Sequence, residues 1–92
     1  MASVVKFGRK VKEVRLLLSQ TGASSRGARE FLSKYYEGVK NANPGLKILV
    51  REAEHISPKC YARYEYGKEA GVSLVQNTAE EVIEKFKELN RV

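Results

Sequence analysis

The sequence holds a single cysteine, Cys60, among its 92 residues, and it has no tryptophan and two prolines. One cysteine cannot form an intramolecular disulfide, which excludes a disulfide-stapled scaffold and suits a reducing compartment. The longest apolar runs, Leu16–Leu18 and Ile48–Val50, fall far short of the roughly 20 residues that span a bilayer. No apolar segment typical of a secretory signal follows the N-terminus. These absences favour one small globular domain.

The composition is that of a folded protein with a basic first half. Hydrophobic residues make up 42% and charged residues 30% of the chain, which argues against disorder. The formal net charge is +6. Residues 1–40 contain nine Lys or Arg and three Glu, whereas residues 41–92 contain eight of each sign. A basic face of this kind can meet nucleic acid, an anionic membrane or an acidic protein, and charge alone does not choose among them.

The first half of the chain predicts a βαβ unit. Residues 1–10 are basic and free of acid, and we expect them to form an extended arm. Residues 11–18 suit a strand that is buried on both faces, since they close on three leucines. Ser24 or Ser25 is placed to cap a helix of about four turns, and residues 46–51 suit a second, parallel strand. The predicted helix carries one apolar stripe, made of Ala28, Phe31, Leu32, Tyr35 and Val39.

The second half predicts a hairpin followed by a helix. Residues 60–66 alternate as a half-exposed strand does, residues 67–71 form a loop, and residues 72–75 return as the antiparallel partner. Thr78 and Glu81 have the spacing of a capping box at the start of a helix. The buried stripe of that helix is Val82, Ile83, Phe86 and Leu89. The predicted fold is therefore α/β, in the order β-α-β-β-β-α, with a mixed four-stranded sheet between two helices.

This order of elements resembles the minimal thioredoxin fold. Proteins of that fold place a cis-proline just before the first strand of the C-terminal hairpin, and the Ser57–Pro58 bond occupies that position here, so we expect it to be cis. A thioredoxin-type oxidoreductase also needs a cysteine at the start of the first helix, where the helix dipole lowers the thiol pKa. Residues 19–30 contain no cysteine. The sequence thus predicts a thioredoxin-like domain over 11–92 that has no active-site dithiol.

Several short stretches carry a closer resemblance. They are Ser24–Phe31, Asn43-Pro44 with Ile48–Glu52, and Pro58-Lys59 with Ala62–Tyr64. They are similar to a small accessory subunit of mitochondrial NADH:ubiquinone oxidoreductase (respiratory complex I), which shares its domain family with two mitochondrial ribosomal proteins. The Arg-Glu pair after the second strand and the Ala-Arg-Tyr run followed by Gly67 favour the complex I branch. Members of that branch often carry a cysteine at the end of the first strand, where this chain has Ser19.

The resemblance implies a non-catalytic structural subunit that supports assembly or stability of the matrix-side peripheral arm. Its expected partners are other complex I subunits, in particular the iron–sulfur subunits of that arm, and its expected place is the matrix side of the mitochondrial inner membrane. It implies no cofactor of its own. The alternative within the same family is an RNA-contacting mitochondrial ribosomal protein, for which the positive charge is favourable. A free redox or glutathione-binding domain is disfavoured by the missing cysteine.

Four arginines are the candidate partner contacts, because exposed Arg is enriched at protein interfaces. They are Arg26, Arg29, Arg51 and Arg63. Cations in the first turns of a helix are mildly unfavourable for its dipole, so we expect Arg26 and Arg29 to serve assembly more than folding. No catalytic, metal-binding or cofactor-binding residue is predicted, because Cys60 reads as a buried structural thiol and His55 as a surface histidine.

Overall fold

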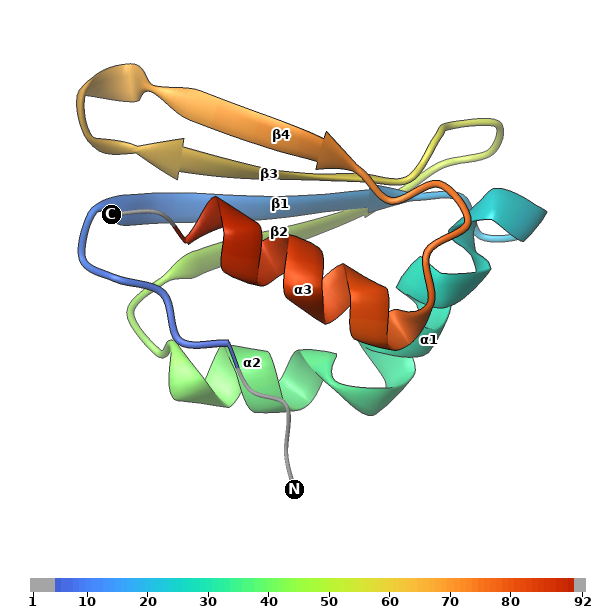
Figure 1. Cartoon of the computed structure of the whole chain (residues 1–92), viewed down its shortest axis with the longest axis horizontal. Coiled ribbons are helices and arrows are strands. Elements are labelled where there is room, and N and C mark those ends of the chain that lie inside the picture. The colour runs from blue at the N-terminus through green and yellow to red at the C-terminus, as the bar shows by residue number, and fades with distance from the viewer. Residues whose placement is uncertain (1–4, 91–92) are drawn as a thin grey trace.

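The computed structural model describes residues 5–90, which form a two-layer α/β fold of one sheet and its helices (Figure 1). Its elements in chain order are β1 (Val11–Leu18), a 3-10 turn (Ala23–Ser25), α1 (Arg26–Lys34), α2 (Tyr36–Ala42), β2 (Lys47–Glu52), β3 (Lys59–Tyr64), a second 3-10 turn (Glu65–Gly67), β4 (Glu69–Ser73) and α3 (Ala79–Leu89). The four strands lie in the order β2-β1-β3-β4.

The sheet is mixed, as the sequence predicts. Strand β1 is parallel to β2 and antiparallel to β3, and β3 is antiparallel to β4. Helices α1 and α2 connect the parallel strands β1 and β2, and the second 3-10 turn connects the antiparallel strands β3 and β4. The first strand has the predicted bounds, whereas β4 begins three residues earlier than expected, at Glu69. The prediction of four strands in a mixed sheet is confirmed.

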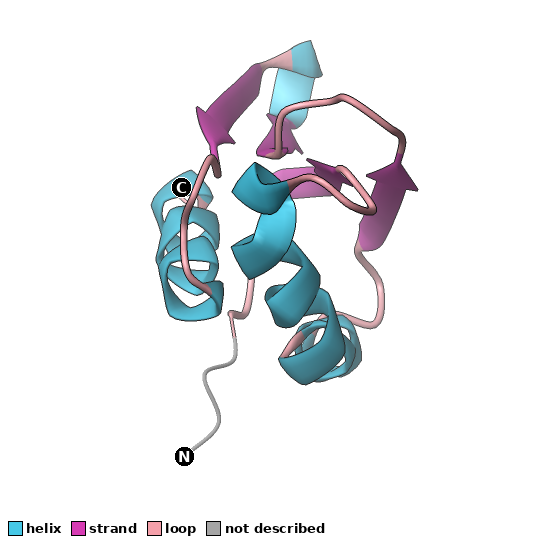
Figure 2. Ribbon diagram, turned by 90° about the vertical axis from the view of Figure 1, so that its right-hand side faces the viewer, coloured by secondary structure: helices cyan, strands magenta, loops and turns pink. Residues whose placement is uncertain are grey.

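All three helices lie on one side of the sheet (Figures 1 and 2). The ring of Phe31 in α1 packs against that of Phe86 in α3, with centroids 5.2 Å apart. Two helices in direct contact cannot lie on opposite faces of the sheet between them. The prediction of a sheet sandwiched between two helices was therefore wrong. The buried stripes of α1 and α3 both pack into the same core, on one face of the sheet.

The predicted single first helix is broken at Tyr35. The backbone there has φ −124° and ψ −18°, so α1 ends and α2 begins on the next residue. Phe31 before the break and Val39 after it are both buried, at 1% and 4% exposure. The apolar stripe that the spacing predicts therefore faces the core on both sides of the break.

The core lies between the helices and one face of β1. Val14, Leu16 and Leu18 are buried on that face, and Leu17 between them is half-buried on the other. The prediction that β1 is buried on both faces was wrong for this reason. The helices supply the opposite side of the core through the buried residues Ala28, Phe31, Val39, Val82, Ile83, Phe86 and Leu89.

The capping box of α3 is confirmed. Thr78 Oγ1 accepts a hydrogen bond from the Glu81 amide at 3.1 Å, and Glu81 Oε1 accepts one from the Thr78 amide at 2.8 Å. The start of α1 lies against the loop that leads to this cap. A Cβ on Gly27 would lie 1.6 Å from the Asn77 carbonyl oxygen, so only glycine permits this approach. These contacts hold the two halves of the chain together.

The segment Val5–Gly8 packs on the fold instead of extending from it. Val5 is buried, and the Phe7 ring meets the Phe86 ring edge-on with centroids 6.2 Å apart. The side chain of Asn43 binds the backbone of Val5 and Phe7, and that of Asn90 binds the backbone of Lys6 and Gly8. The expected arm over residues 1–10 therefore does not hold for this segment, because apolar and amide contacts dock it. Residues 1–4 of the arm lie outside the described residues.

The Ser57–Pro58 bond is trans, so the prediction of a cis bond was wrong. Trans is the lower-energy isomer of an X-Pro bond by about 0.5–1 kcal/mol. Here the loop from β2 to β3 reverses at His55, which adopts a left-handed φ of 62°, and the chain reaches β3 without a cis bond. Pro58 is buried, and its carbonyl accepts a hydrogen bond from the Leu74 amide at 2.9 Å.

Removing the Phe31 ring should destabilise the domain strongly. We expect Phe31→Ala to lower the free energy of unfolding by about 3–5 kcal/mol, because the ring is fully buried and leaves a cavity. Tyr66→Ala is the control, since that tyrosine is 93% exposed. Urea unfolding followed by circular dichroism compares the two variants. Equal midpoints for them would contradict the packing described here.

Candidate functional site

The loop before α1 is organised by two serines and contains no thiol. Ser19 Oγ accepts hydrogen bonds from the amides of Thr21 and Gly22, at 3.3 and 2.9 Å. Ser25 occupies the N-cap position of α1, as predicted, but its hydroxyl makes no capping bond and accepts from the Ser19 amide at 2.9 Å. Both hydroxyls are therefore engaged in holding the loop between β1 and α1.

Arg29 stabilises this same loop. Its guanidinium donates to the carbonyl oxygens of Ser19 and Gly22, at 3.1 and 2.8 Å. The side chain therefore has a structural role that the sequence did not predict, since it satisfies two backbone acceptors. The helical position alone did not reveal these partners, which lie seven and ten residues earlier in the chain. Arg26, the first residue of α1, is exposed.

Cys60 is a buried structural thiol, as the alternation predicts. It is 0% exposed on the core face of β3. Burial raises the pKa of the thiol to about 12. The Lys85 charge lowers this pKa by a smaller amount, and the Glu88 charge raises it. A thiol that is protonated at neutral pH is a poor nucleophile. His55 is exposed in the loop between β2 and β3, which confirms its surface position.

The face of the sheet away from the helices forms a regular array, which we call the open sheet face. Because partnered residues share a face, the strand registers define three rows across β2, β1, β3 and β4. The rows are Lys47–Glu13–Arg63–Glu69, then Leu49–Arg15–Tyr61–Gly71, then Arg51–Leu17–Lys59–Ser73.

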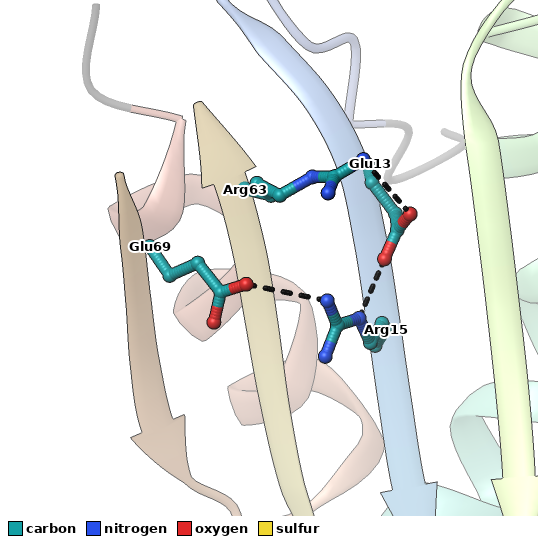
Figure 3. Close-up of polar contacts among 4 residues, drawn as sticks. All are labelled: Glu13, Arg15, Arg63 and Glu69. Atoms are coloured by element: carbon teal, nitrogen blue, oxygen red, sulfur yellow. Dashed lines mark hydrogen bonds and ion pairs between the residues drawn. The ribbon is translucent and has the colours of Figure 1, made fainter. Parts of the chain in front are cut away.

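The first row and its neighbour Arg15 form a charge network (Figure 3). Arg15 bonds to Glu13 and reaches Glu69 at 3.2 Å, and Arg63 lies 3.5 Å from Glu13. Glu13 is only 6% exposed. The hydrogen bond from Arg15 is the main reason that the pKa of this carboxyl is lowered, and the Arg63 and Lys47 charges act in the same direction. A nearly buried carboxylate is thus kept ionised by its neighbours.

The structure separates the four candidate arginines into two pairs. Arg51 and Arg63 share the open sheet face, where they join Arg15, whereas Arg26 and Arg29 belong to the start of α1. Sequence reasoning missed Glu13, Arg15 and the rest of the array. The signal was present: Glu13, Arg15 and Leu17 alternate with buried Val14, Leu16 and Leu18, which is the pattern of a strand with one polar face.

Chemical groups for catalysis are sparse in the part of the chain that the structure covers. Across residues 5–90, no three or more His, Cys, Asp or Glu side chains gather in a way that could hold a metal ion. Over the same residues no helix has the length and hydropathy to cross a membrane. The geometry therefore defines a small α/β domain whose main exposed feature is a charged and partly apolar sheet surface.

Comparison with known proteins gives the family. The model of the mitochondrial ribosomal protein L51 / S25 / CI-B8 domain matches residues 28–79. The chain is 47% identical over 68 residues to the NADH-ubiquinone oxidoreductase 10.5 kDa subunit of Neurospora crassa. The matched residues make up 74% of this chain and 72% of that protein. It is 42% identical over 72 residues to the NADH dehydrogenase [ubiquinone] 1 alpha subcomplex subunit 2 of Mus musculus, and these residues make up 78% of this chain and 73% of that protein.

The protein of the latter name in Arabidopsis thaliana is 36% identical over 83 residues, which cover 90% of this chain and 86% of that one. The chain belongs to the L51 / S25 / CI-B8 domain family. The family resemblance seen in the sequence is thereby confirmed.

Arg29 and Arg26 should differ in their effect on stability. We expect Arg29→Ala to lower the free energy of unfolding by about 1–3 kcal/mol, since two backbone acceptors lose a charged donor. Arg26→Ala, at an exposed position, should stay within about 0.5 kcal/mol of the unaltered chain. Thermal melts of the two single variants measure this difference. A neutral Arg29→Ala would remove the structural role assigned to that side chain.

Cys60 should resist alkylation in the folded protein. With a pKa of about 12, almost none of the thiol is ionised at pH 8, and the side chain is also enclosed. Iodoacetamide should therefore label the unfolded chain in urea at least about 100-fold faster than the native chain. Mass spectrometry at timed intervals gives both rates. Rapid labelling of the native protein would show that the thiol is accessible.

Proposed function

We propose that this protein is a non-catalytic accessory subunit of mitochondrial respiratory complex I, where it supports assembly or stability of the matrix-side peripheral arm. The observation that carries the proposal is the set of relatives, at 36–47% identity over most of the chain, that are named as subunits of NADH:ubiquinone oxidoreductase. The similarity spans both halves of the fold, because the longest match covers 90% of the chain.

The loop before α1 and Cys60 support the proposal that the subunit is non-catalytic. The loop carries Ser19 and Ser25, and both hydroxyls accept hydrogen bonds from the backbone. A serine hydroxyl cannot form a disulfide, and the one thiol of the chain is enclosed on the core side of β3. Thiol–disulfide exchange requires an accessible thiolate, so this chain is not built for that reaction.

We also infer that the domain over 11–92 is thioredoxin-like. The support is topological: a βαβ unit is followed by an antiparallel hairpin and a helix, in the strand order β2-β1-β3-β4. Only β3 runs against the other three strands. The packed segment Val5–Gly8 adds to this domain at the ends of α2 and α3.

The proposed partners are other complex I subunits, in particular the iron–sulfur subunits of the peripheral arm. The proposed place is the matrix side of the inner membrane. The basic surface, with a net charge of +6, favours acidic protein neighbours there. The open sheet face and the exposed Arg26 are the surfaces with the residue types of a protein interface.

Co-migration in mitochondrial extracts tests this function. We expect the tagged chain, expressed in a eukaryotic cell and released with a mild detergent, to migrate on native gels with NADH dehydrogenase activity. Its sedimentation should not change after ribonuclease treatment, because protein contacts hold it. Migration with ribosomal RNA, together with release by ribonuclease or by moderate salt, would instead indicate the ribosomal branch of the family.

A further inference from the structure

No helix or strand of the described residues 5–90 covers the open sheet face. Leu49 on this face is 42% exposed, and Leu17 and Tyr61 beside it are half-buried. Together with Arg15, Arg51 and Glu69 they line a hollow of about 600 Å³. The other face of the same sheet is covered by three helices. A sheet with antiparallel pairs can leave one face in water. The apolar side chains on this face, rather than the type of sheet, therefore mark it as a candidate docking surface.

The dimensions of the face suit one helix. Four strands about 4.8 Å apart span roughly 14 Å, and three same-face positions about 6.8 Å apart span roughly 14 Å along the strands. A helix with its side chains is about 10–12 Å wide and gains 5.4 Å per turn. Two to three turns of a single helix therefore cover the array, whereas a second sheet would extend beyond it.

The charges on the face indicate the chemistry of that helix. In the first row each carboxylate has a cationic neighbour, since Glu13 and Glu69 are bound by arginines. The third row holds Arg51 and Lys59 with no carboxylate, and across residues 5–90 neither of them forms an ion pair with another side chain. Two unpaired cations at one end of an apolar patch complement acidic groups.

Tyr61 is held in place for such a contact by Gly71. A Cβ on Gly71 would lie 2.5 Å from Cδ1 and Cε1 of the Tyr61 ring, so the ring lies across β4 where a side chain would otherwise stand. The ring thereby offers a flat apolar surface on the β4 side of the face, whereas Leu49 lies on β2 with Arg15 between them. A preoriented aromatic side chain loses little conformational entropy when a partner covers it.

We propose that the open sheet face binds one amphipathic helix of a neighbouring complex I subunit. The apolar stripe of that helix covers Leu17, Leu49 and Tyr61, and its Asp or Glu side chains pair with Arg51 and Lys59. This inference rests on the proposed function, because it names the surface by which the subunit is held.

Charge reversal on the open sheet face tests the proposal. In cells that lack their own copy of the subunit, Arg51→Glu with Lys59→Glu should lower incorporation into complex I at least tenfold. The matched control is Lys34→Glu with Lys40→Glu, which makes the same charge change at exposed positions of α1 and α2. The control should assemble normally. Native gels stained for NADH dehydrogenase activity measure both, and melting curves show that both fold. Normal assembly of the first variant, or an equal loss in the control, overturns the proposal.

Gly71→Ala tests the apolar part without altering charge. The added methyl forces the Tyr61 ring out of its position, at a cost that the flexible side chain can absorb, so the chain still folds. We expect incorporation to fall several-fold. Gly45→Ala is the control, since a Cβ there meets nothing within 4 Å. Unchanged incorporation of Gly71→Ala contradicts the role of the Tyr61 ring.

Photo-crosslinking identifies the occupant. A benzophenone amino acid in place of Leu49, activated in the intact complex, should join one helical segment of another complex I subunit that contains Asp or Glu. A crosslink to a second copy of this chain, to lipid or to a non-helical segment overturns the inference. The proposed function is tested separately by the unaltered chain. If that chain does not enter complex I, the proposed function is wrong. If it enters normally and the variants of the open sheet face enter equally well, only the docking surface is rejected.

Discussion

The contact between Phe31 and Phe86 is the interaction on which the arrangement of this domain depends. One ring comes from the first half of the chain and the other from the last helix, and their centroids are 5.2 Å apart. Because α1 and α3 are in contact, their apolar side chains pack on one side of the sheet. No helix among the described residues lies on the opposite side (Figure 2). The exposed array of arginines, carboxylates and leucines there is a direct consequence of how the core is built.

Periodicity in the sequence predicted those structural features that depend on residues close together along the chain. The bounds of β1 and the capping box at Thr78 were correct because local alternation and a three-residue spacing determine them. The break at Tyr35 was not predicted, because the apolar residues on both sides of it keep the spacing of one continuous helix. The layer arrangement failed for a similar reason: helix stripes show that a face is buried but do not show on which side of the sheet it lies.

The candidate site shows the same division. Arg51 and Arg63 were identified by residue type, and their shared surface became visible only with the registers of β1 to β2 and β3. Arg29 was expected to serve assembly more than folding, because its helical position gave no reason for a folding role, yet its guanidinium binds two carbonyl groups of the preceding loop. Ser19 organises the loop after β1, since its hydroxyl satisfies two backbone amides there.

The docked segment Val5–Gly8 has a consequence for local unfolding. Its backbone is held by the side chains of Asn43 and Asn90, and its phenylalanine rests on Phe86. The end of α3 therefore cannot fray alone, because each opening of Asn90 also releases an amide 82 residues earlier. Both ends of the described chain open as one cooperative unit. A protease that cuts after Gly8 would thus loosen the last helix as well as shorten the first segment.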